Sequence, residues 1–443
     1  MKKWHIGWTV VGSLTAGLLA ALLLVATPFI RAQESEVTGA VLCGFAVGWA
    51  MLAFLSIRFT NQPQRWAFAP AAFFGISGLL LVVFGSSVDG VLSWIWPPSL
   101  LALVIWMFIH ARRRLDSRSR GWLLYPVMAV LALLSIGGGY QTVALAADAS
   151  AHPMPGELID VGGHSLHLYC AGSGSPTVVL QPGAGEMSSN HGWIRPAVAR
   201  DTRVCIYDRA GKGWSDPADA TQDASQITTE LHTLLHDGNV PGPYVLAGHS
   251  FGGLYVLTFA ARYPDEVVGM VLIDSTAPQS PPAGDPEAPA ASSVGDYSVM
   301  GRISTLMSTS GRVGLSRLYS PFEDLDSLPP TSRDEVRANI ATSNNLRSTL
   351  DEYVQGNASM QEAAALTDFG TKPLIVLTAG TGSDSKHLAS EEKLAALSTN
   401  NLHLTVKTAT HESLIADKND ASVTTQAILD VVTSVRDGEP LVN

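Results

Sequence analysis

The chain has 443 residues, enough for two or three domains, and carries a net charge of −11 at pH 7. The charge is divided unevenly, because residues 1–150 hold 10 basic and 5 acidic side chains, whereas residues 151–443 hold 18 and 34. An acidic C-terminal part argues against nucleic acid as a partner, and three cysteines without zinc spacing exclude both a disulfide-rich scaffold and a cysteine zinc site.

The first third of the chain is predicted to lie in a membrane. Five apolar runs, each long enough to cross the hydrocarbon core as a helix, follow one another: residues 6–30, 37–57, 66–84, 91–109 and 122–147. The fourth run is the weakest, because Trp96-Pro97-Pro98 interrupts it. We expect residues 1–147 to form a helical membrane domain, followed by a linker at residues 148–156.

Charged side chains between the runs predict how this domain is oriented. Basic residues dominate before the first run, between the second and third, and between the fourth and fifth, whereas the other connections are more acidic. The positive-inside rule then places the amino terminus in the cytoplasm and the C-terminal part outside the cell membrane. The first run could instead be a cleaved signal peptide, which leaves that outcome unchanged. We interpret the domain as a packed anchor, while a role in binding lipid or a partner stays open.

Residues 157–443 show the pattern of an α/β domain. Short apolar runs that read as strands alternate with amphipathic helical segments. The strands are expected at residues 158–161, 165–170, 177–180, 203–207, 244–247, 267–273, 374–378 and 402–407. This alternation predicts a mostly parallel sheet with helices on both faces.

The pattern changes from about residue 276 to residue 370, where helical segments occur without a strong strand. A helical insertion between two strands of such a sheet is interpreted as a lid over the site. Its apolar residues would either line a substrate pocket or pack the lid onto the body of the domain.

The strongest motif is Gly-His-Ser-Phe-Gly at residues 248–252, which joins an apolar strand to a helix. A serine on such a sharp turn stands clear of the backbone, where a base and a carbonyl group can reach it from opposite sides. Gly248 and Gly252 leave room where side chains would clash. The pentapeptide is also common in flexible turns, so the interpretation depends on the rest of the domain.

Residues from about Glu157 to Val435 resemble the α/β hydrolases. The segment at residues 207–216, Tyr-Asp-Arg-Ala-Gly-Lys-Gly-Trp-Ser-Asp, is similar to a loop of that family and precedes the Gly-His-Ser-Phe-Gly turn. The resemblance implies a triad in the order Ser, Asp, His. Ser250 is the expected nucleophile and His411, just after the last strand, the expected base. We expect Asp384, after the strand at residues 374–378, to orient the histidine, with Asp274 as the competitor.

The resemblance also implies an oxyanion hole made of two backbone N–H groups. One belongs to Phe251 and the other is assigned to Ala184, although Gln-Pro-Gly-Ala at residues 181–184 replaces the family's His-Gly and leaves Gly183 and Gly185 as alternatives. Cys170 and Cys205 fall on strands that are neighbours in this fold. They are expected either to form a disulfide or to remain two buried thiols.

These features predict a membrane-anchored serine hydrolase that cleaves carboxylic esters, lipid-like or otherwise hydrophobic, without a metal or cofactor. Peptidase, thioesterase and acyltransferase activities stay open, since the same triad serves them all. A hydrolase-like domain that binds a ligand or partner without turnover is the alternative of a different class. The sequence does not predict an oligomeric state.

Overall fold

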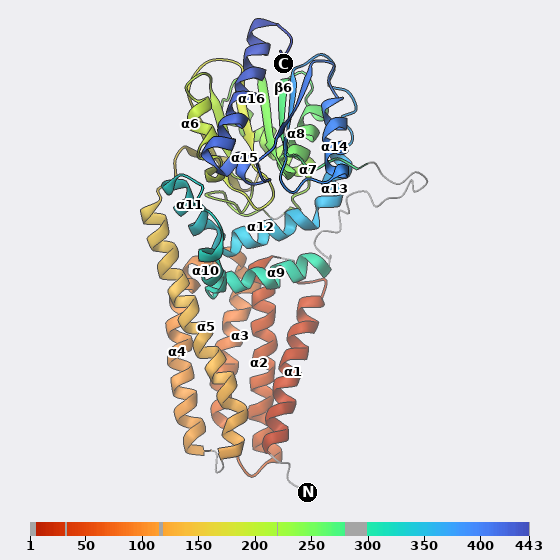
Figure 1. The fold of residues 1–443 in the computed structure, drawn as a ribbon. Helices are drawn as coiled ribbons and strands as arrows, with labels where there is room; N and C mark the ends of the chain where they lie inside the picture. The colour runs from red at the N-terminus through yellow and green to blue at the C-terminus, as the bar shows by residue number, and fades with distance from the viewer. Residues whose placement is uncertain (1–5, 32, 115–117, 219, 280–298, 443) are drawn as a thin grey trace, which may run out of the picture. The chain divides into compact units, whose positions relative to one another are not determined.

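The computed structural model describes residues 6–31, 33–114, 118–218, 220–279 and 299–442. The chain divides into two compact units. The first holds the described residues up to Ser150 together with 299–318, and the second holds the remainder. The elements carry the labels of Figure 1.

The first unit is built on apolar helices. They are α1 (Ile6–Ala26), α2 (Glu34–Phe59), α3 (Phe68–Phe84), α4 (Asp89–Arg114) and α5 (Arg118–Ala151). Length and composition give four candidate membrane spans, the third of which, Arg65–Arg113, contains both α3 and α4. The short turn η2 (Gly85–Val88) separates these two helices, and α4 returns to contact η1 (Arg65–Ala67), which precedes α3. The third candidate is therefore two antiparallel helices, and Pro97 and Pro98 lie inside α4.

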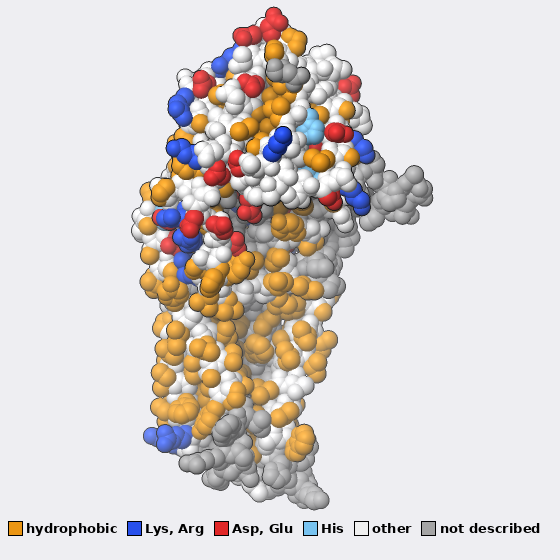
Figure 2. Space-filling view, in the orientation of Figure 1, with side chains coloured by type: hydrophobic (Ala, Val, Ile, Leu, Met, Phe, Trp, Pro, Cys, Tyr) orange, Lys and Arg blue, Asp and Glu red, His pale blue; other side chains and the backbone are white. Residues whose placement is uncertain are grey.

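Small residues let these helices approach closely. A Cβ atom added to Gly44 of α2 would fall 2.3 Å from the backbone of Ala21 in α1. One added to Gly39 of α2 would fall 2.7 Å from the carbonyl oxygen of Gly78 in α3. Figure 2 shows hydrophobic side chains over much of the visible face of this unit. A packed, apolar helical unit is thus what the N-terminal sequence forms.

Part of the expected lid belongs to this first unit. Helix α9 (Val299–Arg312) and α10 (Leu315–Tyr319) follow β6 in the chain, yet three of their arginines bond to the ends of the apolar helices. Arg302 donates to three backbone carbonyls, Arg312 pairs with two carboxylates, and Arg317 lies 2.7 Å from one. The acceptors are Val25, Thr27, Ile30, Glu34, Asp89 and Asp148. Residues 299–318 of the expected lid at residues 276–370 thus group with the first unit, and residues 280–298 lie outside the described residues.

The second unit contains an eight-stranded sheet. Its strands are β1 (Glu157–Asp160), β2 (Ser165–Ala171), β3 (Thr177–Gln181), β4 (Val204–Tyr207), β5 (Tyr244–His249), β6 (Val267–Ile273), β7 (Leu374–Ala379) and β8 (Asn401–Val406). The order across the sheet is β1-β2-β4-β3-β5-β6-β7-β8. The pairs β1/β2 and β2/β4 are antiparallel and all others are parallel. The predicted mostly parallel sheet is confirmed.

Helices cover both faces of this sheet, as Figure 1 shows. Alternate residues of β3 point to opposite cores: Val179 packs with α7 (Ala224–Asp237) and α8 (Phe251–Arg262), whereas Val178 packs with α6 (Ile194–Val198) and α16 (Lys418–Asp437). A strand buried on both faces has no polar face to show. This explains why the central strands read as continuous apolar runs in the sequence.

The rest of the insertion between β6 and β7 packs on the second unit. It forms α11 (Pro330–Ile340), α12 (Ser343–Val354) and α13 (Gly356–Ala363), of which α13 contacts α7 and α8. The expected linker at residues 148–156 begins inside a helix, because α5 continues to Ala151. After β7, α14 (Ser385–Ala395) precedes β8, and α15 (Ser413–Ala416) follows it.

Candidate active site

Ser250 lies on the predicted sharp turn between β5 and α8. Its backbone has φ 54° and ψ −122°, a conformation that residues other than glycine rarely adopt. A Cβ atom on Gly252 would fall 2.2 Å from the carbonyl oxygen of Gln181, and one on Gly248 would fall 2.5 Å from that of Gly252. The two glycines are therefore required for the turn, and the strand–turn–helix prediction is confirmed.

His411 stands on the loop between β8 and α15, beside this turn. Its carbonyl oxygen accepts a hydrogen bond of 3.0 Å from Nε2 of His249, and the two imidazole rings are 4.5 Å apart. His249 directly precedes Ser250 in the chain, so the structure brings the predicted base and the predicted nucleophile into one neighbourhood. The His411 side chain is about half exposed, at 46%, which leaves it accessible to a substrate.

The structure places Asp274, and not Asp384, against His411. Oδ2 of Asp274 accepts from Nδ1 of His411 at 2.6 Å. Asp384 is exposed and caps the start of α14, where its carboxylate accepts from the backbone N–H of His387 at 2.8 Å. The prediction that Asp384 orients the histidine is therefore wrong, and its competitor takes that position.

Asp274 is surrounded by hydrogen-bond donors. Its second oxygen, Oδ1, is 2.9 Å from Nε2 of His387 and also accepts from the backbone N–H of Ala379 at 2.9 Å. Burial opposes ionisation, but the donors on His411, His387 and Ala379 outweigh it and lower the pKa of Asp274 to about 2. The carboxylate is thus ionised at neutral pH and can stabilise a positive charge on His411.

His387 was not predicted from the sequence. It lies in the first turn of α14, three residues after the capping Asp384. One turn later, Glu391 is buried, and burial together with the Asp274 carboxylate raises the pKa of Glu391 to about 9. A neutral Glu391 leaves Asp274 as the negative charge of this cluster. The capping motif could have predicted the start of the helix, but not which side of it faces the sheet.

The loop after β3 lies against the nucleophile. A Cβ atom on Gly183 would fall 2.9 Å from Cβ of Ser250. The N–H of Gly183 donates to Glu186 at 2.6 Å, and that of Gly185 donates to Glu352 at 2.9 Å. The N–H groups of both neighbours of Ala184 thus already donate to carboxylates. This favours the N–H of Ala184 as the oxyanion donor among the three alternatives. Phe251 begins α8, as expected for the second donor, and both oxyanion assignments stay predictions.

His249 directly precedes Ser250 in the Gly-His-Ser-Phe-Gly motif, and both nitrogens of its ring make polar contacts. Its Nδ1 is 2.7 Å from the Glu186 carboxylate and its Nε2 faces the carbonyl of His411. Burial disfavours the charged ring, but Glu186 outweighs burial and raises the pKa of His249. Because both partners are acceptors, we assign a protonated His249 that donates to each. This side chain holds the loop of the predicted base next to the turn of the predicted nucleophile.

Cys170 of β2 and Cys205 of β4 form a disulfide across two antiparallel neighbours in the sheet. Of the two alternatives left open by the sequence, the structure has the bonded one.

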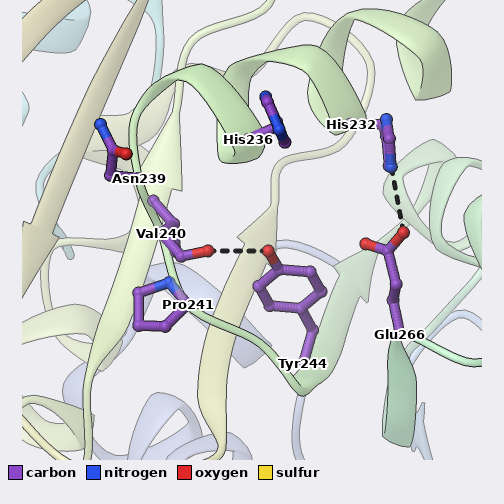
Figure 3. Close-up of a pocket in the computed structure, with 7 residues that line it drawn as sticks. All are labelled: His232, His236, Asn239, Val240, Pro241, Tyr244 and Glu266. Carbon is purple, nitrogen blue, oxygen red and sulfur yellow. Dashed lines mark hydrogen bonds and ion pairs between the residues drawn. The ribbon is translucent and has the colours of Figure 1, made fainter.

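A pocket elsewhere on the second unit is shown in Figure 3. It is lined by α7, the start of β5 and the residues before β6, and it includes a contact of 3.0 Å between His232 and Glu266. These are the amino ends of the parallel strands, whereas Ser250 follows the carboxyl end of β5. The pocket is therefore separate from the candidate active site.

The comparisons with known proteins agree with this fold. A family model described as alpha/beta hydrolase fold matches residues 176–417. The crystal structure of an aCif variant has a TM-score of 0.51 at 16% identity, covering 66% of this chain and 95% of its own. At that identity the likeness supports the fold alone.

Two curated relatives match shorter parts. The chain is 35% identical over 132 residues to an uncharacterized vacuolar membrane protein of Saccharomyces cerevisiae, covering 25% of this chain and 20% of the relative. It is 34% identical over 120 residues to RutD of Pseudomonas savastanoi, named a putative carbamate hydrolase, covering 27% and 45%. The chain spans less than half the length of the curated relatives that it matches here. With the family model matching more than half of its residues, the chain belongs to the α/β hydrolase fold family.

Proposed function

We propose that this protein is a membrane-anchored serine hydrolase in which Ser250, His411 and Asp274 form the triad. The observation that carries the proposal is the strained Ser250 turn beside a histidine whose Nδ1 contacts a buried, ionised aspartate. A serine hydroxyl is a weak nucleophile until a base removes its proton, and this arrangement supplies the base and its orienting group.

The chemistry follows the acyl-enzyme route. The Ser250 oxygen attacks the substrate carbonyl while Nε2 of His411 accepts the serine proton. Asp274 holds Nδ1–H, so that the free nitrogen of His411 faces the reaction, and it stabilises the imidazolium that forms. The N–H groups of Phe251 and Ala184 stabilise the oxyanion. His411 then gives its proton to the leaving group, and a water molecule activated by the same histidine releases the acid.

We propose a carboxylic ester with a hydrophobic part as the substrate. Helix α12 brings the ring of Tyr353 to 5.6 Å from that of Phe251, which places an aromatic pair next to the nucleophile. The apolar helical unit favours a substrate found in or near a membrane. Because one relative is named a putative carbamate hydrolase, other acyl substrates stay possible. A panel of esters of graded acyl length, with the matching carbamates, separates these classes.

A fluorophosphonate probe tests the proposal directly, since it reacts covalently with activated serines. We expect labelling of the wild-type protein and no labelling of Ser250→Ala. Ser422→Ala, which changes an exposed serine on α16, serves as the control and should label like the wild type. A folded wild-type protein that takes up no probe would instead support the alternative, a domain that binds a ligand or partner without turnover.

We also propose that the apolar helices anchor the chain in the cell membrane, with the amino terminus in the cytoplasm and the second unit outside. The alternation of basic and acidic connections supports this orientation, and so does a disulfide, which persists in oxidising compartments. A reporter fused after Asn443 is expected to be active only outside the cytoplasm. Activity of a second reporter, one that functions only in the cytoplasm, at the same position would contradict this orientation.

A further inference from the structure

The loop that carries Ala184 is held by a buried arginine. Nη1 of Arg209 donates to the carbonyl of Pro182 and Nη2 to that of Gly183, both at 2.6 Å, and the side chain is 2% exposed. The peptide unit between Gly183 and Ala184 is planar and trans, so its N–H points opposite to its C=O. By fixing the Gly183 carbonyl, Arg209 therefore fixes the direction of the Ala184 N–H, which points away from the guanidinium.

Arg209 is in turn held by a carboxylate from the insertion between β6 and β7. Oε1 of Glu352, on α12, accepts from Nε of Arg209 at 2.8 Å. Oε2 of the same carboxylate accepts from the N–H of Gly185 at 2.9 Å, and Nζ of Lys212 lies 3.6 Å from it. All three charged side chains are buried. Glu352 thus fixes the loop on both sides of Ala184, through Arg209 before it and through Gly185 after it.

We propose that Glu352 is a positioning residue for the oxyanion hole, so that the site is competent only while α12 is docked on the loop after β3. The inference rests on the proposed hydrolase function. Neighbouring contacts of α12 support it: Tyr353 packs on Phe251, the other predicted donor, and Ser348 donates to the carbonyl of Ala210 at 2.7 Å. One helix therefore contacts the segments of both predicted oxyanion donors.

The expected signature is a loss in kcat with little change in KM, because the oxyanion forms only in the transition state. Glu352→Gln keeps the size of the side chain but offers one acceptor oxygen where two donors, Arg209 Nε–H and Gly185 N–H, need one each. Removal of a single oxyanion donor typically costs about 10²–10³-fold in kcat, and we expect a loss of roughly 10–10³-fold here. Asp351→Asn, the same carboxylate-to-amide change one residue earlier, is the matched control, because Asp351 pairs with Arg347 on its own helix.

A second variant separates positioning from folding. Arg209→Met with Lys212→Met and Glu352→Leu replaces all three buried charges by apolar groups, which often preserves stability. We expect it to fold and still to show the low kcat per folded molecule. Recovery of wild-type kcat in this triple variant, or a Glu352→Gln protein within two-fold of wild type, would overturn the inference. If the wild type neither labels nor hydrolyses esters, the proposed function fails and the inference falls with it.

Discussion

Replacing Asp274 with asparagine is expected to lower kcat by about 10⁴-fold, whereas Asp384→Asn should change it less than about two-fold. The pKa of Asp274 is held at about 2, so the carboxylate is ionised over the whole pH range of an esterase assay. An asparagine amide cannot stabilise the imidazolium, and its N–H₂ group favours the wrong tautomer of His411.

Asp384→Asn is a demanding control for this prediction. Asparagine is as good an N-cap as aspartate, so α14 keeps its start and the variant tests only the carboxylate. Initial rates should be normalised to the amount of folded protein. A large loss in Asp384→Asn together with a small one in Asp274→Asn would show that the loop after β7 rearranges during catalysis and supplies the acid.

Ser250→Ala and His411→Ala are each expected to lower kcat by up to about 10⁶-fold, and the double variant should be no worse than either single one. The two side chains act as a unit, since neither the hydroxyl nor the imidazole accelerates attack without the other. Because the backbone carbonyl of His411 holds His249, alanine at position 411 leaves that contact in place. The comparison is made with the best ester of the acyl-length panel.

His236→Ala controls for removal of a histidine, because the His236 side chain is 80% exposed on α7, near the amino ends of the strands. It should retain wild-type kcat. Losses in Ser250→Ala and His411→Ala that multiply in the double variant would mean that the two residues act independently, which the triad does not allow.

The sequence predicted the parts of the site that depend on local pattern. The turn at Ser250 needs a strand before it, a helix after it and two glycines, all of which lie within a few residues. His411 could be located because it follows the last strand. The aspartate that orients the predicted base could not be located in this way, because Asp274 after β6 and Asp384 after β7 both lie at the carboxyl edge of the sheet. The choice between them depends on which way the β7–α14 connection turns, and here it makes Asp384 a helix cap.

Buried charge pairs could not be predicted from sequence patterns, for a different reason. Glu352 and Arg209 are separated by 143 residues, and nothing around either marks it as buried. Amphipathic spacing predicts that a helix has an inner face, but not which segment that face will contact. The same argument applies to α9, whose arginines bond to the ends of the apolar helices.

The membership of α9 and α10 in the first unit changes how this protein can be dissected. The chain leaves the second unit after β6, contributes residues 299–318 to the first, and then returns. A protein trimmed to start at Ala151 would keep Arg302 and Arg312 but lose the backbone carbonyls and carboxylates to which they donate. Isolating the second unit therefore requires two edits, a cut before Ala151 and replacement of residues 299–318 by a short polar connector.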